Sequence, residues 1–193
     1  MGFGGKMGRW IWLAALLLLP TLGLPMPATA QDRKIGGAFA LIDQDGRAVT
    51  DADFRGRPML VYFGLTYCPD ICPTDLAVIA EAMADLGPAA DRFQPLFITI
   101  DPERDTPEQL RDYMGLFDRR IRGLTGDIKA IAAAARAYRV TYAKYDIQGP
   151  LDYRMDHSAF IYLMDRDGRF VTRFPQGTSP EQLAAALRAA LES

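Results

Sequence analysis

Two cysteines and one histidine carry the distinctive chemistry of this sequence. Cys68 and Cys72 are its only cysteines, three residues separate them, and His157 is the only histidine of the 193 residues. A thiolate is both a nucleophile and a soft metal ligand, and a neutral imidazole is a common metal ligand. Two thiolates and one imidazole therefore suit copper, above all Cu(I), with Zn(II) as the competitor.

Simpler roles exist for the same residue types. Two cysteines in an exported protein most often form a structural disulfide, and a lone histidine is most often an ordinary surface or hydrogen-bonded residue. Structural zinc usually has four protein ligands, and we find three candidates. Met155 is another soft donor, but the sequence leaves its orientation relative to His157 open. The charged residues 101–105 fit a solvated loop better than a docking face.

The segments around the cysteines predict a strand, a turn and a helix. Residues 59–63 form an apolar run without polar alternation, which predicts a strand buried on both faces. Pro73 favours a helix start, so we expect Cys72 to be the N-cap of a helix that runs to Leu86. The dipole and free N–H groups of a helix N-terminus favour the thiolate form of a cysteine placed there.

The rest of the chain alternates between strand and helix patterns. In order, we expect a hairpin over 39–50, a strand over 94–100, helices over 106–117 and 127–138, a short edge strand over 140–145, a polar loop over 146–156, a hairpin of strands over 158–164 and 170–174, and a helix that begins at Ser179. Both Thr106 and Ser179 open capping-box patterns, with glutamine three residues later.

This order predicts an α/β thioredoxin-like fold, with a central mixed sheet flanked by helices and an N-terminal β-hairpin extension. In such a fold the strand that follows His157 begins beside the cysteine turn, where a proline usually stands. This sequence has His157-Ser158 there instead. The redox motif of such folds has two residues between its cysteines, whereas this sequence has three. The longer turn leaves more room between the sulfurs, so it can hold an ion or still close a disulfide.

The N-terminus predicts export from the cytoplasm. Residues 1–30 contain Lys6 and Arg9, an apolar stretch and a terminal Ala-Thr-Ala pattern, which together are typical of a cleaved signal peptide. An uncleaved anchor is the alternative. Either way residues 31–193 would form one domain in the bacterial periplasm or an equivalent space. The net charge of −2 and the lack of a basic run argue against nucleic acid as a partner.

Five motifs, in order, resemble the SCO/SenC copper chaperones over roughly residues 35–191. The motifs are Gly64-Leu-Thr-Tyr-Cys-Pro-Asp-Ile-Cys-Pro73, Ile100-Asp-Pro-Glu-Arg-Asp-Thr-Pro107, Gly123-Leu-Thr-Gly126, Ala135-Arg-Ala-Tyr-Arg-Val140 and Asp152-Tyr-Arg-Met-Asp-His-Ser158. The resemblance implies a thioredoxin-like domain that binds one copper ion through Cys68, Cys72 and His157.

The resemblance also implies a function and partners. It implies copper delivery to cytochrome c oxidase during assembly, chiefly to the dinuclear copper site of apo subunit II, which is a chaperone role and not an enzymatic one. Another periplasmic copper chaperone or a thioredoxin-like reductant would fit as further partners. The alternative is a thiol-disulfide reductase for the oxidase cysteines, in which Cys68 attacks and Cys72 resolves. A thiol peroxidase ranks last. Peroxiredoxins share the fold but carry a Thr-x-x-Cys motif, whereas Thr66 lies only two residues before Cys68 in this sequence.

Two features depart from the family pattern. Tyr67 stands where many members have a histidine before the first cysteine. This removes no expected ligand, but it is expected to alter the redox tuning of the site. The N-terminal segment looks more readily cleaved than the usual membrane anchor of the family, so the mode of attachment is left open.

Overall fold

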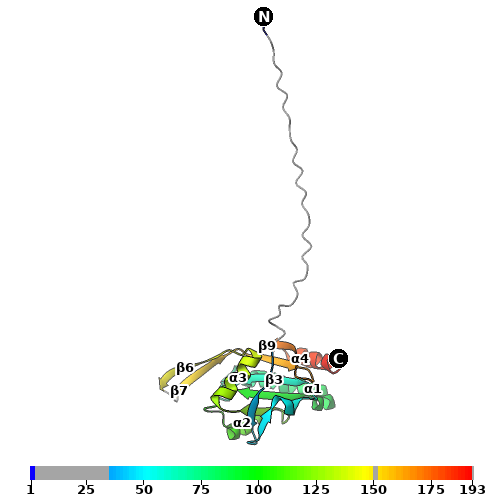
Figure 1. The fold of residues 1–193 in the computed structure, drawn as a ribbon. Coiled ribbons are helices and arrows are strands. Elements are labelled where there is room, and N and C mark those ends of the chain that lie inside the picture. The colour runs from blue at the N-terminus through cyan, green and yellow to red at the C-terminus, as the bar shows by residue number, and fades with distance from the viewer. Residues whose placement is uncertain (3–34, 150–151, 193) are drawn as a thin grey trace.

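The computed structural model describes residues 1–2, 35–149 and 152–192, so all but the first two residues of the expected signal segment lie outside the described part (Figure 1). The strands are β1 (Ala40–Asp43), β2 (Ala48–Thr50), β3 (Met59–Gly64), β4 (Gln94–Thr99), β5 (Arg122–Thr125), β6 (Tyr142–Gly149), β7 (Asp152–His157), β8 (Phe160–Met164) and β9 (Phe170–Pro175). The helices are α1 (Ile71–Leu86), α2 (Pro107–Met114), α3 (Ile128–Tyr138) and α4 (Pro180–Glu192), with 3-10 turns at Asp51–Phe54 and Gly87–Arg92.

A mixed seven-stranded sheet forms the centre of the domain, in the order β2-β1-β5-β4-β3-β8-β9. Strands β3, β4 and β5 run parallel, as helical crossovers require, and every other neighbouring pair is antiparallel. This arrangement confirms the expected thioredoxin-like α/β fold. The pairing of β1 with β2 confirms the N-terminal hairpin.

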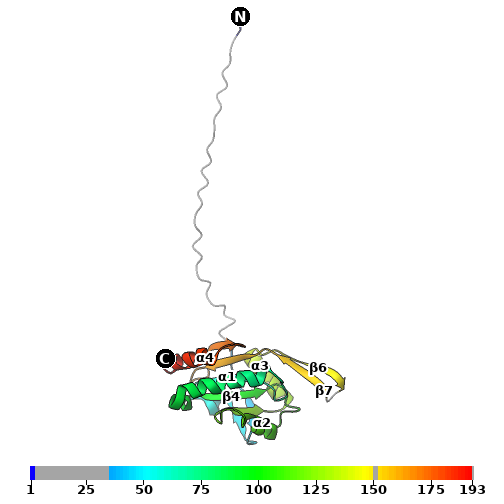
Figure 2. The ribbon, with the colours of Figure 1, turned by 180° about the vertical axis from the view of Figure 1, so that it is seen from behind.

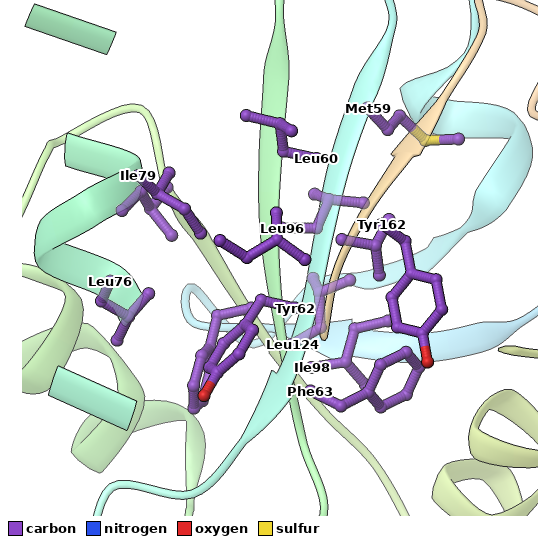
Figure 3. Packing of buried hydrophobic residues seen from close by; sticks show 14 of the residues in the cluster. Met59, Leu60, Tyr62, Phe63, Leu76, Ile79, Leu96, Ile98, Leu124 and Tyr162 are labelled. Carbon is purple, nitrogen blue, oxygen red and sulfur yellow. The ribbon is translucent and has the colours of Figure 1, made fainter. Parts of the chain in front are cut away.

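The core lies on both faces of the central strands. Every residue of β3 and β4 is buried, as the apolar runs predicted. On one face the Tyr62 ring contacts Phe97, and on the other the Phe63 ring packs 5.3 Å from that of Tyr138 in α3. Figure 3 shows Leu76 of α1 on the Tyr62 side of the sheet. Helix α3 therefore covers one face, while α1 and its neighbour α4 cover the other (Figure 2).

Strand β5 is an element that the sequence analysis missed. It has only four residues, of which Gly123 weakens the strand pattern. It is held in the sheet by hydrogen bonds to the strands on either side, β4 and β1. A Cβ atom at Gly123 would lie 3.1 Å from Leu110 and from Met114 of α2, so any larger residue would require these side chains to shift. Tertiary packing, and not local propensity, therefore makes this strand.

Residues 142–157 correct two expectations. The expected edge strand and the expected polar loop over 146–156 together form one β-hairpin, β6–β7, which is a two-stranded sheet of its own. Both views show it extending from one end of the domain (Figures 1 and 2). Its charged and polar residues give it a sequence pattern typical of a loop. They are accommodated because only one face of the hairpin turns toward the domain.

Helix boundaries also differ from expectation at two ends. Helix α1 begins at Ile71 with Asp70 as its N-cap, so Cys72 lies inside the first turn. Pro73 is tolerated there because the first N–H groups of a helix have no intrahelical partner. Helix α2 ends at Met114 and not at residue 117.

The N-terminal starts of α2 and α4 agree with the sequence. Ser179 and Gln182 form the expected reciprocal capping box of α4, with contacts of 3.0 and 3.3 Å. Thr106 caps α2 by accepting from the Gln109 amide at 3.2 Å. Among the described helices, none has both the length and the apolar character needed to cross a membrane.

Candidate metal centre

The turn between β3 and α1 places Cys68 at the N-terminal end of α1. The amide of Cys72 points at the Cys68 sulfur, with a nitrogen–sulfur distance of 3.4 Å. The pKa of Cys68 is lowered to about 5, chiefly by a hydrogen bond from the Cys72 side chain and then by the backbone amides of Cys72, Asp70 and Ile71, while burial opposes them. Cys68 is half-buried and ionised at neutral pH.

Cys72 is the opposite of Cys68 in both burial and protonation. Its side chain is fully buried, and its pKa is raised, first by its hydrogen bond to the Cys68 sulfur and then by burial. The chain leaves room for this sulfur at Gly64, where a Cβ atom would come within 2.9 Å of Cys72 Sγ. The pair therefore consists of one half-buried thiolate and one buried thiol.

His157 ends strand β7, and its ring reaches the buried cysteine. Its Nε2 atom lies 3.5 Å from Cys72 Sγ, across 85 residues of sequence. Its Nδ1 atom lies 3.2 Å from the carbonyl oxygen of Ser158. A carbonyl oxygen can only accept, so we assign the proton to Nδ1. In the neutral ring, Nε2 then presents a lone pair toward the cysteine.

The three predicted ligands lie near one another but do not form a complete coordination shell. Cys72 contacts both Cys68 and His157, whereas no contact joins Cys68 to His157 directly. In the described ranges, no three cysteine, histidine or acidic side chains stand ready-made in metal-binding geometry. Their use as one ligand set therefore needs small side-chain movements and belongs to the proposals below.

A buried carboxylate anchors the turn that carries Cys68. Asp105 is fully buried and accepts from the Thr66 amide at 3.1 Å, the Thr66 hydroxyl at 2.7 Å and the Thr99 hydroxyl at 2.6 Å. Burial raises the pKa of Asp105, while the threonine hydrogen bonds act in the opposite direction. Asp105 thus ties the residue two before Cys68 to the end of β4.

A second set of contacts fixes the hairpin that carries His157. Arg104 pairs with the buried Asp101 at 2.5 Å and donates to the Tyr153 carbonyl oxygen at 3.1 Å. Its guanidinium also lies 3.8 Å from the centre of the Tyr153 ring and 4.7 Å from that of Tyr67. The Tyr153 hydroxyl donates to Asp101 at 2.7 Å. Asp101, Arg104 and Asp105 are therefore packed between the turn and the hairpin and not solvated as expected, whereas Glu103 is exposed.

Sequence reasoning missed Asp105, Tyr153 and Asp75 as parts of this centre. Asp75 is 4% exposed, and burial raises its pKa, while the Tyr62 hydroxyl acts in the opposite direction. A signal did exist for Asp75, because it lies three residues after Cys72 on the stripe that Ile79 continues. An acid on an apolar stripe marks a special environment. Asp105 carried no comparable signal.

Comparison with known proteins identifies a family for this chain. The sequence model of the SCO1/SenC family matches residues 27–192. Protein sco1 of Schizosaccharomyces pombe is 40% identical over 173 residues, which is 88% of this chain and 63% of that protein. The SCO2-like protein of Rickettsia felis is 38% identical over 187 residues, which is 92% of this chain and 91% of that one. The chain thus spans less than two thirds of the fission yeast protein, and 58% of the bovine SCO2 homologue.

A solved structure agrees with this result. Bradyrhizobium japonicum ScoI with copper bound is similar at a TM-score of 0.76 and 48% sequence identity, covering 81% of this chain and 99% of that one. Sequence and structure comparisons therefore point to the same family, over nearly all of the described domain. The chain belongs to the SCO1/SenC family.

Proposed function

We propose that this protein is a copper chaperone that binds one Cu(I) ion through Cys68 Sγ, Cys72 Sγ and His157 Nε2. The observation that carries the proposal is the 3.5 Å approach of His157 Nε2 to Cys72 Sγ, beside an ionised Cys68. The two cysteines and the histidine come from elements far apart in sequence, and Cys72 contacts both of the others. Nothing in the hydrophobic core requires these three residue types together.

The protonation of the two cysteines fits reversible loading. Cys68 is already a thiolate at neutral pH, so it can take the ion first. Cys72 must lose its proton to become a ligand, and His157 must present its neutral nitrogen. Copper binding then releases a proton and pulls the hairpin toward α1. A three-ligand set leaves one side of the ion open to the incoming donors of an acceptor.

The relatives support copper as the cargo. The similar ScoI proteins of Bradyrhizobium japonicum and Arabidopsis thaliana are both described with copper bound, at 48% and 37% identity. We infer the acceptor from the family resemblance, as apo cytochrome c oxidase subunit II and its dinuclear copper site. The export signal expected at residues 1–30 would put this exchange in the periplasm, with the chain either free or anchored to the inner membrane.

The direct test is a Cu(I) titration of the reduced chain, with X-ray absorption at the copper edge. We expect one ion per chain, with two cysteine sulfurs and one imidazole nitrogen among its ligands. Cys68→Ser and Cys72→Ser should each remove one of these sulfur scatterers and weaken binding strongly. Stoichiometric, equally tight binding by both variants would refute the assignment.

The asymmetry of the two thiols supports thiol-disulfide reduction as a second candidate function. The Cys68 thiolate would attack a substrate disulfide, forming a mixed disulfide and releasing one substrate thiol. Cys72 would then lose its proton and displace the second thiol, leaving a Cys68–Cys72 disulfide and a substrate reduced by two electrons. A thiol reductant would have to restore the pair.

Trapping distinguishes this candidate from copper transfer alone. Replacing Cys72 with serine keeps the nucleophile and removes the resolving thiol. Incubation with an oxidised peptide from the copper site of subunit II should then yield a stable mixed disulfide at Cys68. The absence of any adduct, with Cys68 alkylating normally, would rule out the reductase role.

A further inference from the structure

The face of β7 that turns toward the domain carries three residues in a row at the strand period of two. Tyr153 is buried, while Met155 and His157 are half-buried, and the intervening Arg154 and Asp156 are exposed. Tyr153 contacts Arg104, and His157 contacts Cys72. Met155 lies between these two contacts on the same face, which settles the orientation that the sequence left open.

Met155 and Cys68 line the same cavity. This cavity has a volume of about 260 Å³ and is bordered by Tyr67, Ile71 and Arg104 as well. Cys68 and Met155 therefore border one partly open cavity, on the side of the cysteine turn that faces the hairpin. His157 approaches Cys72 from the end of the same strand.

The chemistry of a thioether suits this place. Methionine is an unbranched side chain with three rotatable bonds and a polarisable sulfur, so it can swing within a cavity of this size. Thioether sulfur binds Cu(I) as a soft ligand, and as a neutral donor it is held more weakly than a thiolate. Leucine or isoleucine would fill the same space without offering a donor.

We propose that Met155 is a fourth copper ligand, a weak thioether that closes the cavity side of the Cys68, Cys72 and His157 set. This inference rests on the proposed function, because it names a further contact of the same ion. The thioether shields the bound ion from water and is displaced when the donor atoms of an acceptor enter. The cavity then becomes the route by which those donors reach the metal.

Selenomethionine gives a direct test. The full chain is produced with selenomethionine, reduced, loaded with one Cu(I), and measured by X-ray absorption at the copper edge. We expect a selenium scatterer bound to copper in the wild type. Met155→Leu should lose that scatterer while keeping the sulfur and nitrogen shells. Met114→Leu, which changes a buried methionine of α2, is the control that should keep it.

The outcomes separate this inference from the function on which it rests. Copper surrounded by two sulfurs and one nitrogen, with no selenium in the wild type, would overturn the role of Met155 and leave the chaperone intact. A selenium signal that persists in Met155→Leu would overturn it as well. Failure of the reduced wild-type chain to bind copper at all would overturn both proposals.

Discussion

At the scale of single residues, the site is built on a difference between two cysteines that share one turn. Cys68 receives hydrogen bonds at the start of α1 and is ionised, whereas Cys72 is buried and keeps its proton. Each thiol shifts the other, because the Cys72 side chain donates to the Cys68 sulfur. The sequence predicted an activated thiol at this helix end. It placed Cys72 at the N-cap, whereas the observed start of α1 at Ile71 puts Cys72 inside the first turn.

The reactivity of Cys68 should reveal this difference. In the reduced, metal-free chain, we expect the rate of iodoacetamide alkylation at Cys68 to rise with a midpoint near the pKa of about 5. Cys72 should stay unmodified at neutral pH. Peptide mass spectrometry after timed alkylation at a series of pH values measures both.

Two variants control this experiment. Cys72→Ala removes the largest cause of the shift and should raise the pKa of Cys68, whereas Cys72→Ser keeps a donor and should raise it less. A Cys68 midpoint near that of a free thiol, about 8.5, in the wild type would contradict the account.

The same shift gives a pH dependence of stability. The pKa of Cys68 in the fold lies below that of an unfolded thiol, about 8.5. Its ionisation therefore stabilises the fold fully above about pH 8.5, and this contribution is lost as the pH falls through about 5. The wild type should gain more stability than Cys68→Ala between pH 5 and 8 in urea unfolding. Equal pH dependence of the two chains would contradict the shift.

Asp105 is expected to stabilise the cysteine turn through its hydrogen bonds. Asp105→Ala leaves the Thr66 amide and the Thr99 hydroxyl without their acceptor, so we expect a loss of roughly 2–4 kcal/mol in urea unfolding. Asp105→Asn keeps one acceptor oxygen and should cost less. Asp167→Ala, at an exposed turn, is the control and should change stability by no more than about 0.5 kcal/mol. A similarly small effect of Asp105→Ala would show that the cysteine turn is stable without the hydrogen bonds of Asp105.

At the scale of elements, the β6–β7 hairpin decides whether His157 can reach the cysteines. The hairpin pairs with no strand of the main sheet. Its side-chain links to the loop at 101–105 include the Arg104 contacts and the 2.6 Å pair between Lys144 and Glu103. Sequence patterns predicted the central strands because their residues are uniformly apolar. They failed for this hairpin because charged and polar residues interrupt its apolar pattern, and the inward face of β7 carries only three informative positions.

Removing Arg104 should loosen the hairpin. Arg104→Ala leaves Asp101 buried with the Tyr153 hydroxyl as its remaining side-chain partner, so we expect a loss of about 2–4 kcal/mol. Hydrogen exchange should speed up in β6 and β7 and change little in β3 and β4. Arg169→Ala, whose ion pairs are largely exposed, is the matched control. Unchanged exchange in the hairpin of Arg104→Ala would show that other contacts hold it.

At the scale of the whole molecule, the proposed ion would join two parts that share no strand pairing. Cys68 and Cys72 belong to the main domain, and His157 to the hairpin. The motifs in the sequence were sufficient for the fold class and for the three candidate ligands. They could not give the hairpin, strand β5 or the anchoring by Asp105, because each of these depends on partners distant in sequence.

Copper should therefore stabilise the molecule as a whole. A ligand at 100 times its dissociation constant adds about 2.7 kcal/mol to the free energy of unfolding, if the unfolded chain does not bind it. We expect buffered Cu(I) to raise the urea midpoint and to slow hydrogen exchange in β6 and β7. A rise in the midpoint with no protection of the hairpin would mean that His157 takes no part in binding.

The central claim is that Cys68, Cys72 and His157 act as one set of ligands, and a competition titration tests it most directly. The reduced chain is titrated with Cu(I) against a chromophoric chelator, beside His157→Ala and the control Asp146→Asn, which changes an exposed residue of β6. Loss of a hydrogen-bond partner behind a ligand costs 10–100-fold in affinity, so loss of the ligand itself should cost about 100-fold or more. We expect that loss in His157→Ala and wild-type affinity in Asp146→Asn. Equal affinity in all three chains would contradict the account.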